Sequence, residues 1–179
     1  EEIADAVLLI WYPGEEGGNA VADILFGDVA PSGRLPITFP KSLEQLPAYE
    51  DYTMKGRTYR YMEAEPLYPF GFGLSYTRFS YDKITVSNKQ LKKGQSVQVS
   101  ASIHNAGRVA ADEVVQLYLS PVNINASLPL YSLKGFQRIH LKAGETKTVS
   151  FLLPADAFAL ANEKGEMVVH EGQYNISVA

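Results

Sequence analysis

The sequence contains no cysteine, which excludes disulfide bonds, zinc–thiolate sites and iron–sulfur clusters. No apolar run approaches the roughly 18 residues that a helix needs to span a bilayer, so we expect no membrane span. Basic runs are also short, since Lys92 and Lys93 form the longest stretch of adjacent basic residues. A nucleic-acid-binding protein usually shows a basic patch or stripe, and we therefore expect no nucleic-acid partner.

The composition is that of a folded domain. Hydrophobic residues make up 46% and charged residues 20% of the 179 positions, and the formal net charge is −4. These values are typical of a soluble globular protein with one or two domains and are too apolar for a disordered chain. The chain begins Glu1-Glu2-Ile3, without an initiator Met or a signal peptide, so we expect an internal piece of a larger protein.

One strand–turn–helix unit is predicted at the start of the chain. The stretch 6–12 is apolar without alternation, which is typical of a strand buried on both faces of a parallel sheet. Pro13-Gly14 ends it, and a helix should begin near Glu15 and Glu16 and stop at Gly27. A single such unit cannot bury its own sheet. We expect residues 1–76 to be poorly ordered or self-associating unless something covers them.

Proline, glycine and tyrosine dominate residues 30–76. The prolines rule out long regular elements, and Arg34–Phe39 is predicted at most as a short edge strand. Tyrosine combines a large apolar area with a polar tip, which suits a segment packed between domains. The aromatic residues of the second half could also stack on sugar rings, but packing between domains is the favoured interpretation for Tyr59, Tyr61, Tyr68, Phe70, Phe72 and Tyr76.

Residues after Phe79 alternate between apolar and polar with the period of a strand. Val97, Val99, Ala101 and Ile103 give the clearest example, and further stretches repeat it around 115–119, 149–153 and 174–178. Glycine-containing turns separate these stretches. Roughly seven short strands over about 100 residues predict an immunoglobulin-like or fibronectin type III-like sandwich. The fold class expected is therefore mainly β, with a partial α/β segment in front.

Several motifs, in this order, resemble glycoside hydrolase family 3. Residues 13–27 (PGEEGGNAVADILFG), 31–36 (PSGRLP) and 38–40 (TFP) look like the end of the family's α/β-sandwich domain. Residues 56–61 (GRTYRY) and 66–76 (PLYPFGFGLSY) resemble the segment that follows. Residues 105–107 (NAG), 113–118 (EVVQLY), 133–136 (LKGF) and 143–145 (AGE) are similar to its fibronectin type III-like domain.

The resemblance implies two domains, 1–76 and 77–179. It implies a parent enzyme that hydrolyses β-glucosides, β-xylosides or related glycosides with retention of configuration. The sequence of residues 56–61 is slightly closer to that of the β-xylosidase branch. An extracellular or periplasmic location is favoured on the same ground. The partners implied are a β-linked oligosaccharide or glycoside and the upstream catalytic domains of the same protein.

No catalytic residue is assigned in this chain. A retaining glycosidase needs two carboxyl groups about 5–5.5 Å apart, and in the family the nucleophilic aspartate and the acid/base glutamate both lie upstream of the matched motifs. Glu15 and Glu16 are better explained as charges at a helix start, and Glu63 and Glu65 as solvated loop residues. The chain alone should be inactive.

Metal and cofactor sites are not expected either. His104, His140 and His170 are scattered, without a second ligand at metal spacing. Residues 71–76 lack the third glycine of a dinucleotide fingerprint. Asn125-Ala126-Ser127 and Asn175-Ile176-Ser177 fit the glycosylation pattern, which is frequent by chance. No substrate-binding residue is assigned.

Two functions remain open. In the first, the chain is a non-catalytic part of a glycosidase that supports domain packing. In the second, the sandwich is a carbohydrate-binding or adhesion module, which would need an exposed aromatic platform. Its candidates are Tyr118, Tyr131 and Phe136.

Overall fold

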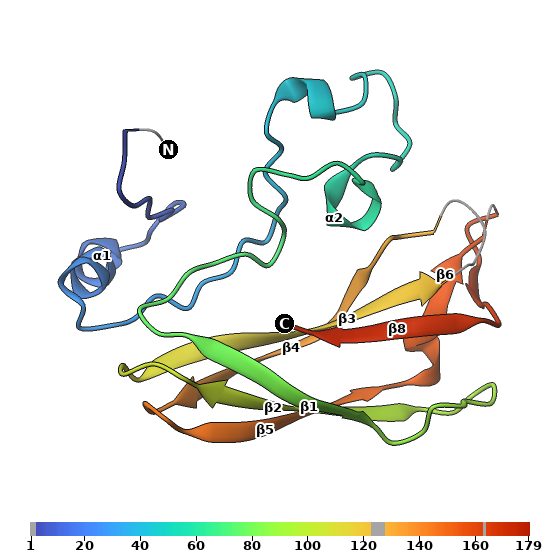
Figure 1. The fold of residues 1–179 in the computed structure, drawn as a ribbon. Helices are drawn as coiled ribbons and strands as arrows, with labels where there is room; N and C mark the ends of the chain where they lie inside the picture. Colours follow the sequence, from blue (N-terminus) through green and yellow to red (C-terminus); the bar gives the residue numbers. More distant parts are fainter. Residues whose placement is uncertain (1–2, 123–127, 163) are drawn as a thin grey trace.

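The computed structural model describes residues 3–122, 128–162 and 164–179. Two helices and a 3-10 turn come first: α1 (Gly17–Phe26), η1 (Leu43–Gln45) and α2 (Thr58–Tyr61). Strands follow from residue 79 onward (Figure 1). They are β1 (Phe79–Val86), β2 (Val97–Asn105), β3 (Ala111–Val122), β4 (Ser132–Leu141), β5 (Thr146–Leu153), β6 (Ala159–Ala161), β7 (Met167–Val169) and β8 (Gln173–Val178), with the 3-10 turn η2 (Ala155–Phe158) between β5 and β6.

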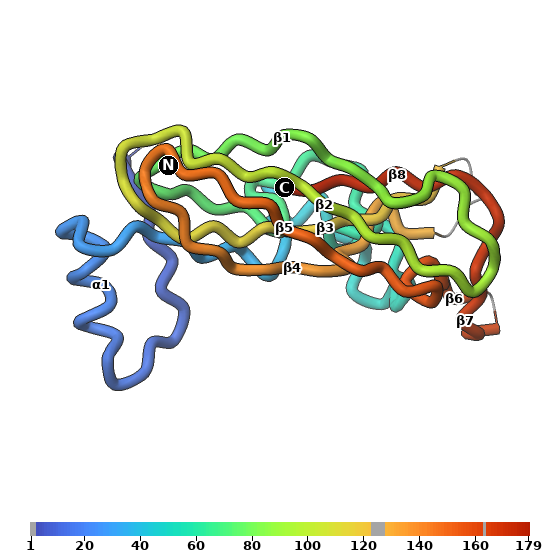
Figure 2. Tube along the Cα trace, turned by 90° about the horizontal axis from the view of Figure 1, so that it is seen from below, coloured from blue at the N-terminus to red at the C-terminus, as the bar shows by residue number. Residues whose placement is uncertain are grey.

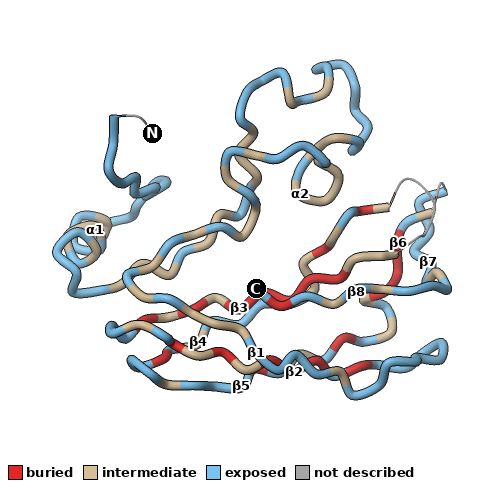
Figure 3. Tube along the Cα trace, in the orientation of Figure 1, coloured by how far each residue is buried: buried red, intermediate tan, exposed pale blue. Residues whose placement is uncertain are grey.

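The strands form two antiparallel sheets that face one another. One sheet has the order β1-β2-β5 and the other β4-β3-β8, while β6 and β7 make a separate hairpin. Buried positions alternate along β2 and cluster in the middle of β3 (Figure 3). The core between the sheets comprises Val97, Val99, Ala101, Ile103, Val115, Leu117, Leu119, Leu141, Val149, Leu153, Phe158 and Val178. The predicted β-sandwich is confirmed, since the expected inward residues are those that the sheets bury.

A β-bulge interrupts the pairing of β3 with β4. Leu117 pairs with Gly135 and Tyr118 with Leu133, so Lys134 is the extra residue between them. A bulge bends the strand and redirects the side chain of its extra residue. Gly135 leaves room for a neighbouring ring beside the bulge, because an added Cβ would lie only 3.0 Å from Phe151 Cδ1.

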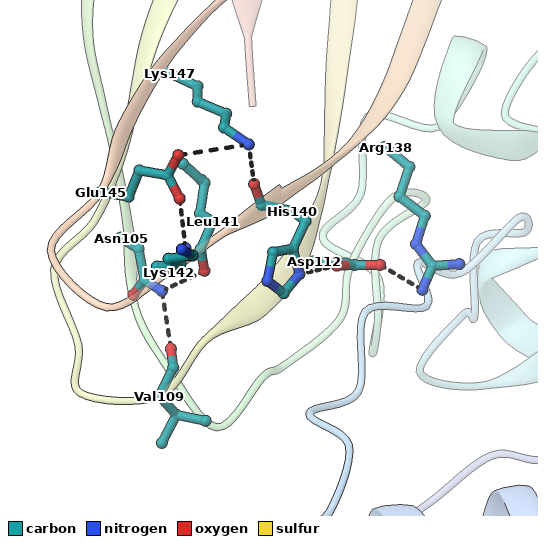
Figure 4. A network of polar contacts seen from close by, with 9 residues as sticks. All are labelled: Asn105, Val109, Asp112, Arg138, His140, Leu141, Lys142, Glu145 and Lys147. Carbon is teal, nitrogen blue, oxygen red and sulfur yellow. Dashed lines mark hydrogen bonds and ion pairs between the residues drawn. The ribbon is translucent and has the colours of Figure 1, made fainter.

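Asn105 anchors the turn between β2 and β3 (Figure 4). Its side chain is fully buried and donates hydrogen bonds to the carbonyls of Val109 and Leu141, at 2.8 and 3.1 Å. Its Oδ1 accepts from the Thr77 hydroxyl and from the Gly107 amide. A buried amide with all these partners fixes three chain segments at once, whereas an apolar replacement would leave several of them without partners.

Residues 3–29 do not form the predicted parallel strand. Ala6–Tyr12 is irregular and exposed, with no strand partner among the described residues, and the strand prediction is wrong for this chain. A parallel strand exists only where neighbouring strands satisfy its backbone. The predicted helix is present, and Gly27 ends it with φ +83°. Figure 2 shows α1 beyond one end of the sandwich.

An exposed ion-pair network lies on the outer face of β3 and β4 (Figure 4). Asp112 accepts from His140 Nδ1 and pairs with Arg138 NH2, each at 2.7 Å. Burial alone would raise the pKa of Asp112, but the hydrogen bonds and charges of His140 and Arg138 hold it below its usual value of 3.8. A carboxylate with a lowered folded-state pKa stabilises the protein above its unfolded-state pKa.

Asp112→Asn should therefore reduce the free energy of unfolding near neutral pH by about 0.5–1 kcal/mol, the amount usual for solvent-accessible pairs. The difference from wild type should vanish as the pH falls through the lowered pKa, since the wild-type carboxylate is then protonated. Urea unfolding across the acid range measures this, with Asp82→Asn, an exposed aspartate on β1, as the matched control. A difference independent of pH would contradict the assignment.

Candidate functional site: the interface between connector and sandwich

The connector, residues 30–78, folds into an irregular ribbon over the sheet β4-β3-β8 (Figure 1). The Leu35 amide donates to Phe72 O and the Gly71 amide to Leu35 O, both at 2.8 Å. The predicted edge strand at Arg34–Phe39 is absent, and only an isolated bridge joins Phe39 to Tyr68. Proline within the stretch removes amide donors, which limits the ladder to a few bonds.

A buried ion pair fastens the connector to the sandwich. Arg34 NH2 lies 2.5 Å from Glu113 Oε2, and the two side chains are 13% and 4% exposed. The other carboxylate oxygen accepts a hydrogen bond from the Tyr81 hydroxyl at 2.7 Å. Burial and the adjacent Glu113 carboxylate raise the pKa of Tyr81. Connector, β3 and β1 thus meet at one carboxylate.

Gly71 brings the connector backbone against the sheet. Its carbonyl accepts from Gln116 Nε2 at 3.2 Å, and Gln116 Oε1 in turn accepts from the Tyr118 hydroxyl at 2.6 Å. Gly71 has φ +81°, and an added Cβ would lie 2.6 Å from both Gln116 Oε1 and the Tyr118 oxygen. Only glycine meets both the conformation and the distance.

Aromatic rings fill the space next to this contact. Tyr59 stacks on Phe70 with centroids 4.1 Å apart and meets Tyr118 and Tyr131 at 6.3 and 5.3 Å. The Tyr59 hydroxyl accepts from the Leu133 amide at 3.1 Å. Burial, followed by the neighbouring tyrosines, raises the pKa of Tyr118 to about 12. Edge and stacked geometries of this kind add stability beyond the apolar area buried.

Arg57 organises the loop that leads into α2. Its guanidinium donates to the carbonyls of Ala48, Asp51 and Thr53 at 3.3, 2.5 and 3.1 Å. The loop therefore has a defined shape although it lacks regular structure. Tyr49 and Tyr52, which belong to this loop, are each 88% exposed.

The carboxylates considered from the sequence do not form a catalytic pair. Glu15 and Glu16 lie exposed at the start of α1, whereas Glu63 and Glu65 lie exposed after α2, which Figure 1 places well away from α1. Glu65 is 2.6 Å from Lys41 Nζ, and the hydrogen bond from this lysine lowers the pKa of Glu65. These positions fit the interpretation of helix-start and loop charges.

Each of the three histidines contacts a different partner. His104 Nδ1 is 2.9 Å from Thr146 Oγ1, His140 bonds to Asp112, and the carbonyl of His170 accepts from the Tyr174 hydroxyl. Within residues 3–122, 128–162 and 164–179, no group of three or more metal-binding side chains gathers. No helix in the same part of the chain is long and apolar enough to cross a membrane.

The aromatic residues considered for sugar stacking lie in different places, and the Tyr61 ring is next to the Arg60 guanidinium. Tyr59 and Phe70 pack against the sandwich, and Tyr68 stacks on Phe72 within the connector at 5.5 Å. Tyr76 is 48% exposed and donates to the carbonyl of Ile24 in α1. The glycosylation triplet at 125–127 lies outside the described residues, whereas Asn175 is exposed on β8.

Comparisons with known proteins agree along the whole chain. The family model described as "Glycosyl hydrolase family 3 C-terminal domain" matches residues 1–76, and the model "Fibronectin type III-like domain" matches residues 113–179. A periplasmic beta-glucosidase of Salmonella typhimurium is 40% identical over 99% of this chain and 25% of its own length. A xylan 1,4-beta-xylosidase of Xylanibacter ruminicola is 43% identical over 98% of this chain and 20% of its own.

The chain belongs to glycoside hydrolase family 3. A solved β-glucosidase structure from Erythrobacter marinus matches it with a TM-score of 0.81 and 38% identity, over 94% of this chain and 23% of the other. The resemblance drawn from the motifs is therefore confirmed. This family 3 chain spans about a quarter of the length of relatives such as the Salmonella protein. The expected boundary between residues 76 and 77 stays a prediction.

Sequence reasoning did not identify the residues that join the two parts of this family 3 chain. The sequence analysis predicted no role for Arg34, Glu113 or Tyr81, although each lies within a motif or a predicted strand. Glu113 carried one signal, because it occupies the same side of β3 as Ala111 and Val115, where alternation calls for an apolar residue. A buried charge at such a position requires a partner, but sequence alone does not reveal that the partner is Arg34.

Gly71→Ala should destabilise the family 3 chain, because the substitution combines a left-handed backbone with a clash against Gln116 and Tyr118. The expected loss is about 2–5 kcal/mol, from about 1–2 for the backbone and about 1–3 for the overpacking. Gly94→Ala is the matched control, since Gly94 has φ +86° but open space around it. Equal losses for both variants in urea unfolding would contradict the close approach at Gly71.

Arg34→Met should cost about 3–5 kcal/mol, because it leaves a buried carboxylate without its cation. Arg34→Met combined with Glu113→Gln should cost less than the sum of the two single changes. A double-mutant cycle in urea measures this coupling. Lys41→Met, which removes the exposed pair with Glu65, is the control and should leave the unfolding midpoint unchanged. Additive effects of Arg34→Met and Glu113→Gln would rule out a direct interaction.

Proposed function

We propose that this chain forms the C-terminal portion of a retaining β-glycosidase acting on β-glucosides or β-xylosides, and that its task there is structural. It braces the family 3 domain through the connector and supplies neither catalytic carboxylate. The observation that carries the proposal is the Arg34–Glu113 pair, buried between the connector and β3. A module evolved only to bind sugar has no need for a buried charge that ties it to a preceding domain.

The exposed surface supports the same assignment over a carbohydrate-binding module. Such a module needs a solvent-facing aromatic platform, yet Tyr118 is only 7% exposed and Tyr131 packs on Tyr59. Phe136 alone among the three candidates is well exposed, at 69%. The substrate class is taken from relatives named as β-glucosidases and β-xylosidases, and the periplasm or the cell exterior is the compartment proposed.

The purified 179-residue chain should not hydrolyse aryl β-glucosides or aryl β-xylosides. A retaining mechanism needs two carboxyl groups about 5–5.5 Å apart, and Glu15, Glu16, Glu63 and Glu65 occupy separated, exposed positions. Release of the aryl alcohol is followed by absorbance, with an intact family 3 β-glucosidase as the positive control. Turnover that persists through successive purification steps would refute the non-catalytic role, and those four glutamates would then be replaced.

The bracing role is tested in a chimera of the Salmonella β-glucosidase whose aligned region is replaced by this chain. Arg34→Met in the chimera should lower the temperature of irreversible inactivation and leave kcat at ambient temperature unchanged. Arg108→Met, at an exposed turn residue, is the matched control. A fall in kcat with unaltered thermal inactivation would instead assign the interface to catalysis.

A further inference from the structure

Two half-buried cations lie near the start of β4, and neither forms a salt bridge within the described part of the chain. Arg60 belongs to α2, and Lys134 is the extra residue of the β4 bulge. In the described part of the chain, neither side chain makes a hydrogen bond or an ion pair within 4.0 Å. Among the other connector cations, Arg34 has a carboxylate in contact and Arg57 donates to three backbone carbonyls. The side chains of Arg60 and Lys134 have neither kind of partner.

The backbone holds Arg60 firmly in this position. The Leu130 amide donates to Arg60 O at 2.6 Å, and the Leu133 amide donates to the hydroxyl of the adjacent Tyr59 at 3.1 Å. These two bonds place α2 directly on the segment that leads into the bulge. The Arg60 guanidinium also lies over the Tyr61 ring, with Cζ 5.6 Å from the ring centroid, which is a cation–π contact on one side of the group.

Arg60 Nε is a buried donor with no acceptor. Leaving a charged donor unpaired in this way costs free energy, and native structures rarely do so without a functional reason. Burial lowers the pKa of Lys134, and the Arg60 charge lowers it further, while Asp156 acts in the opposite direction. Because α2 is hydrogen-bonded to Leu130 and Leu133, next to Lys134, one anion held between the two positive charges would stabilise both.

We propose that Arg60 and Lys134 form a binding site for a carboxylate. The planar guanidinium matches two carboxylate oxygens, and the Lys134 ammonium contributes a third donor from the bulge. The carboxylate proposed belongs to an acidic side chain of another segment of the family 3 enzyme, because this chain spans only about a quarter of the length of relatives such as the Salmonella protein. This inference does not depend on the bracing role.

The test follows the Nε–Hε resonance of Arg60 in ¹H–¹⁵N spectra of the 179-residue chain. Sodium acetate, sodium glucuronate and glucose are added separately at constant ionic strength. Acetate and glucuronate should shift this resonance saturably, with a Kd on the order of 10 mM, which suits a ligand of few atoms. Glucose should not shift it.

Variants separate the site from general charge effects. Lys134→Met should weaken acetate binding at least about fivefold, whereas Lys92→Met, the same change at an exposed turn, should have no effect. Arg60→Gln should abolish the saturable shift in neighbouring amides, with Arg108→Gln as its control. Because Lys134→Met alters no backbone contact, it keeps the test valid if Arg60→Gln fails to fold.

Similar affinities for acetate and glucuronate would support a site for a protein side chain. Glucuronate binding at least about tenfold tighter than acetate would overturn that assignment in favour of a sugar acid. A shift that grows linearly with added salt of any kind would overturn the proposal. So would a shift that is unchanged in Lys134→Met.

Discussion

The carboxylate of Glu113 is the constraint on which the arrangement of this chain depends. It is buried at an inward position of β3, where a charge is tolerated only with partners on both oxygens. Arg34 supplies one partner and Tyr81 the other. These residues come from the connector, β3 and β1. Separating the connector from the sandwich would therefore expose the ion pair to solvent or leave the Glu113 carboxylate buried without its cation. The connector is thereby part of the folded unit.

The remaining contacts of the interface follow from that anchor. The connector has few internal hydrogen bonds because of its prolines, and it obtains others from the sheet through Gln116 and through the Tyr59 hydroxyl. Gly71 allows the backbone to approach that closely. The Tyr59–Phe70 stack then covers Tyr118, which removes from solvent a residue that a sugar-binding module would display.

Much of the sandwich could be predicted from the sequence, because strand alternation depends on local pattern and on one buried face. Val97, Val99, Ala101 and Ile103 are buried as predicted, and Gly27 ends α1 as predicted. The prediction of a strand at Ala6–Tyr12 was wrong, because a parallel strand forms only beside neighbouring strands, and a local sequence pattern does not show whether these are present. The Arg34–Glu113 pair joins residues 79 positions apart, and no local signal encodes such a contact.

The most direct test of the account is amide hydrogen exchange on the 179-residue chain in a demonstrated monomer. If the connector and the sandwich form one unit, the Leu35 and Gly71 amides should be protected nearly as strongly as those of β2. The exposed amides of Ala6–Tyr12 should exchange rapidly in the same experiment. Rapid exchange of the Leu35 and Gly71 amides beside a protected sandwich would contradict the account. It would mean that the connector separates from the sheet and that the Arg34–Glu113 pair does not hold it there.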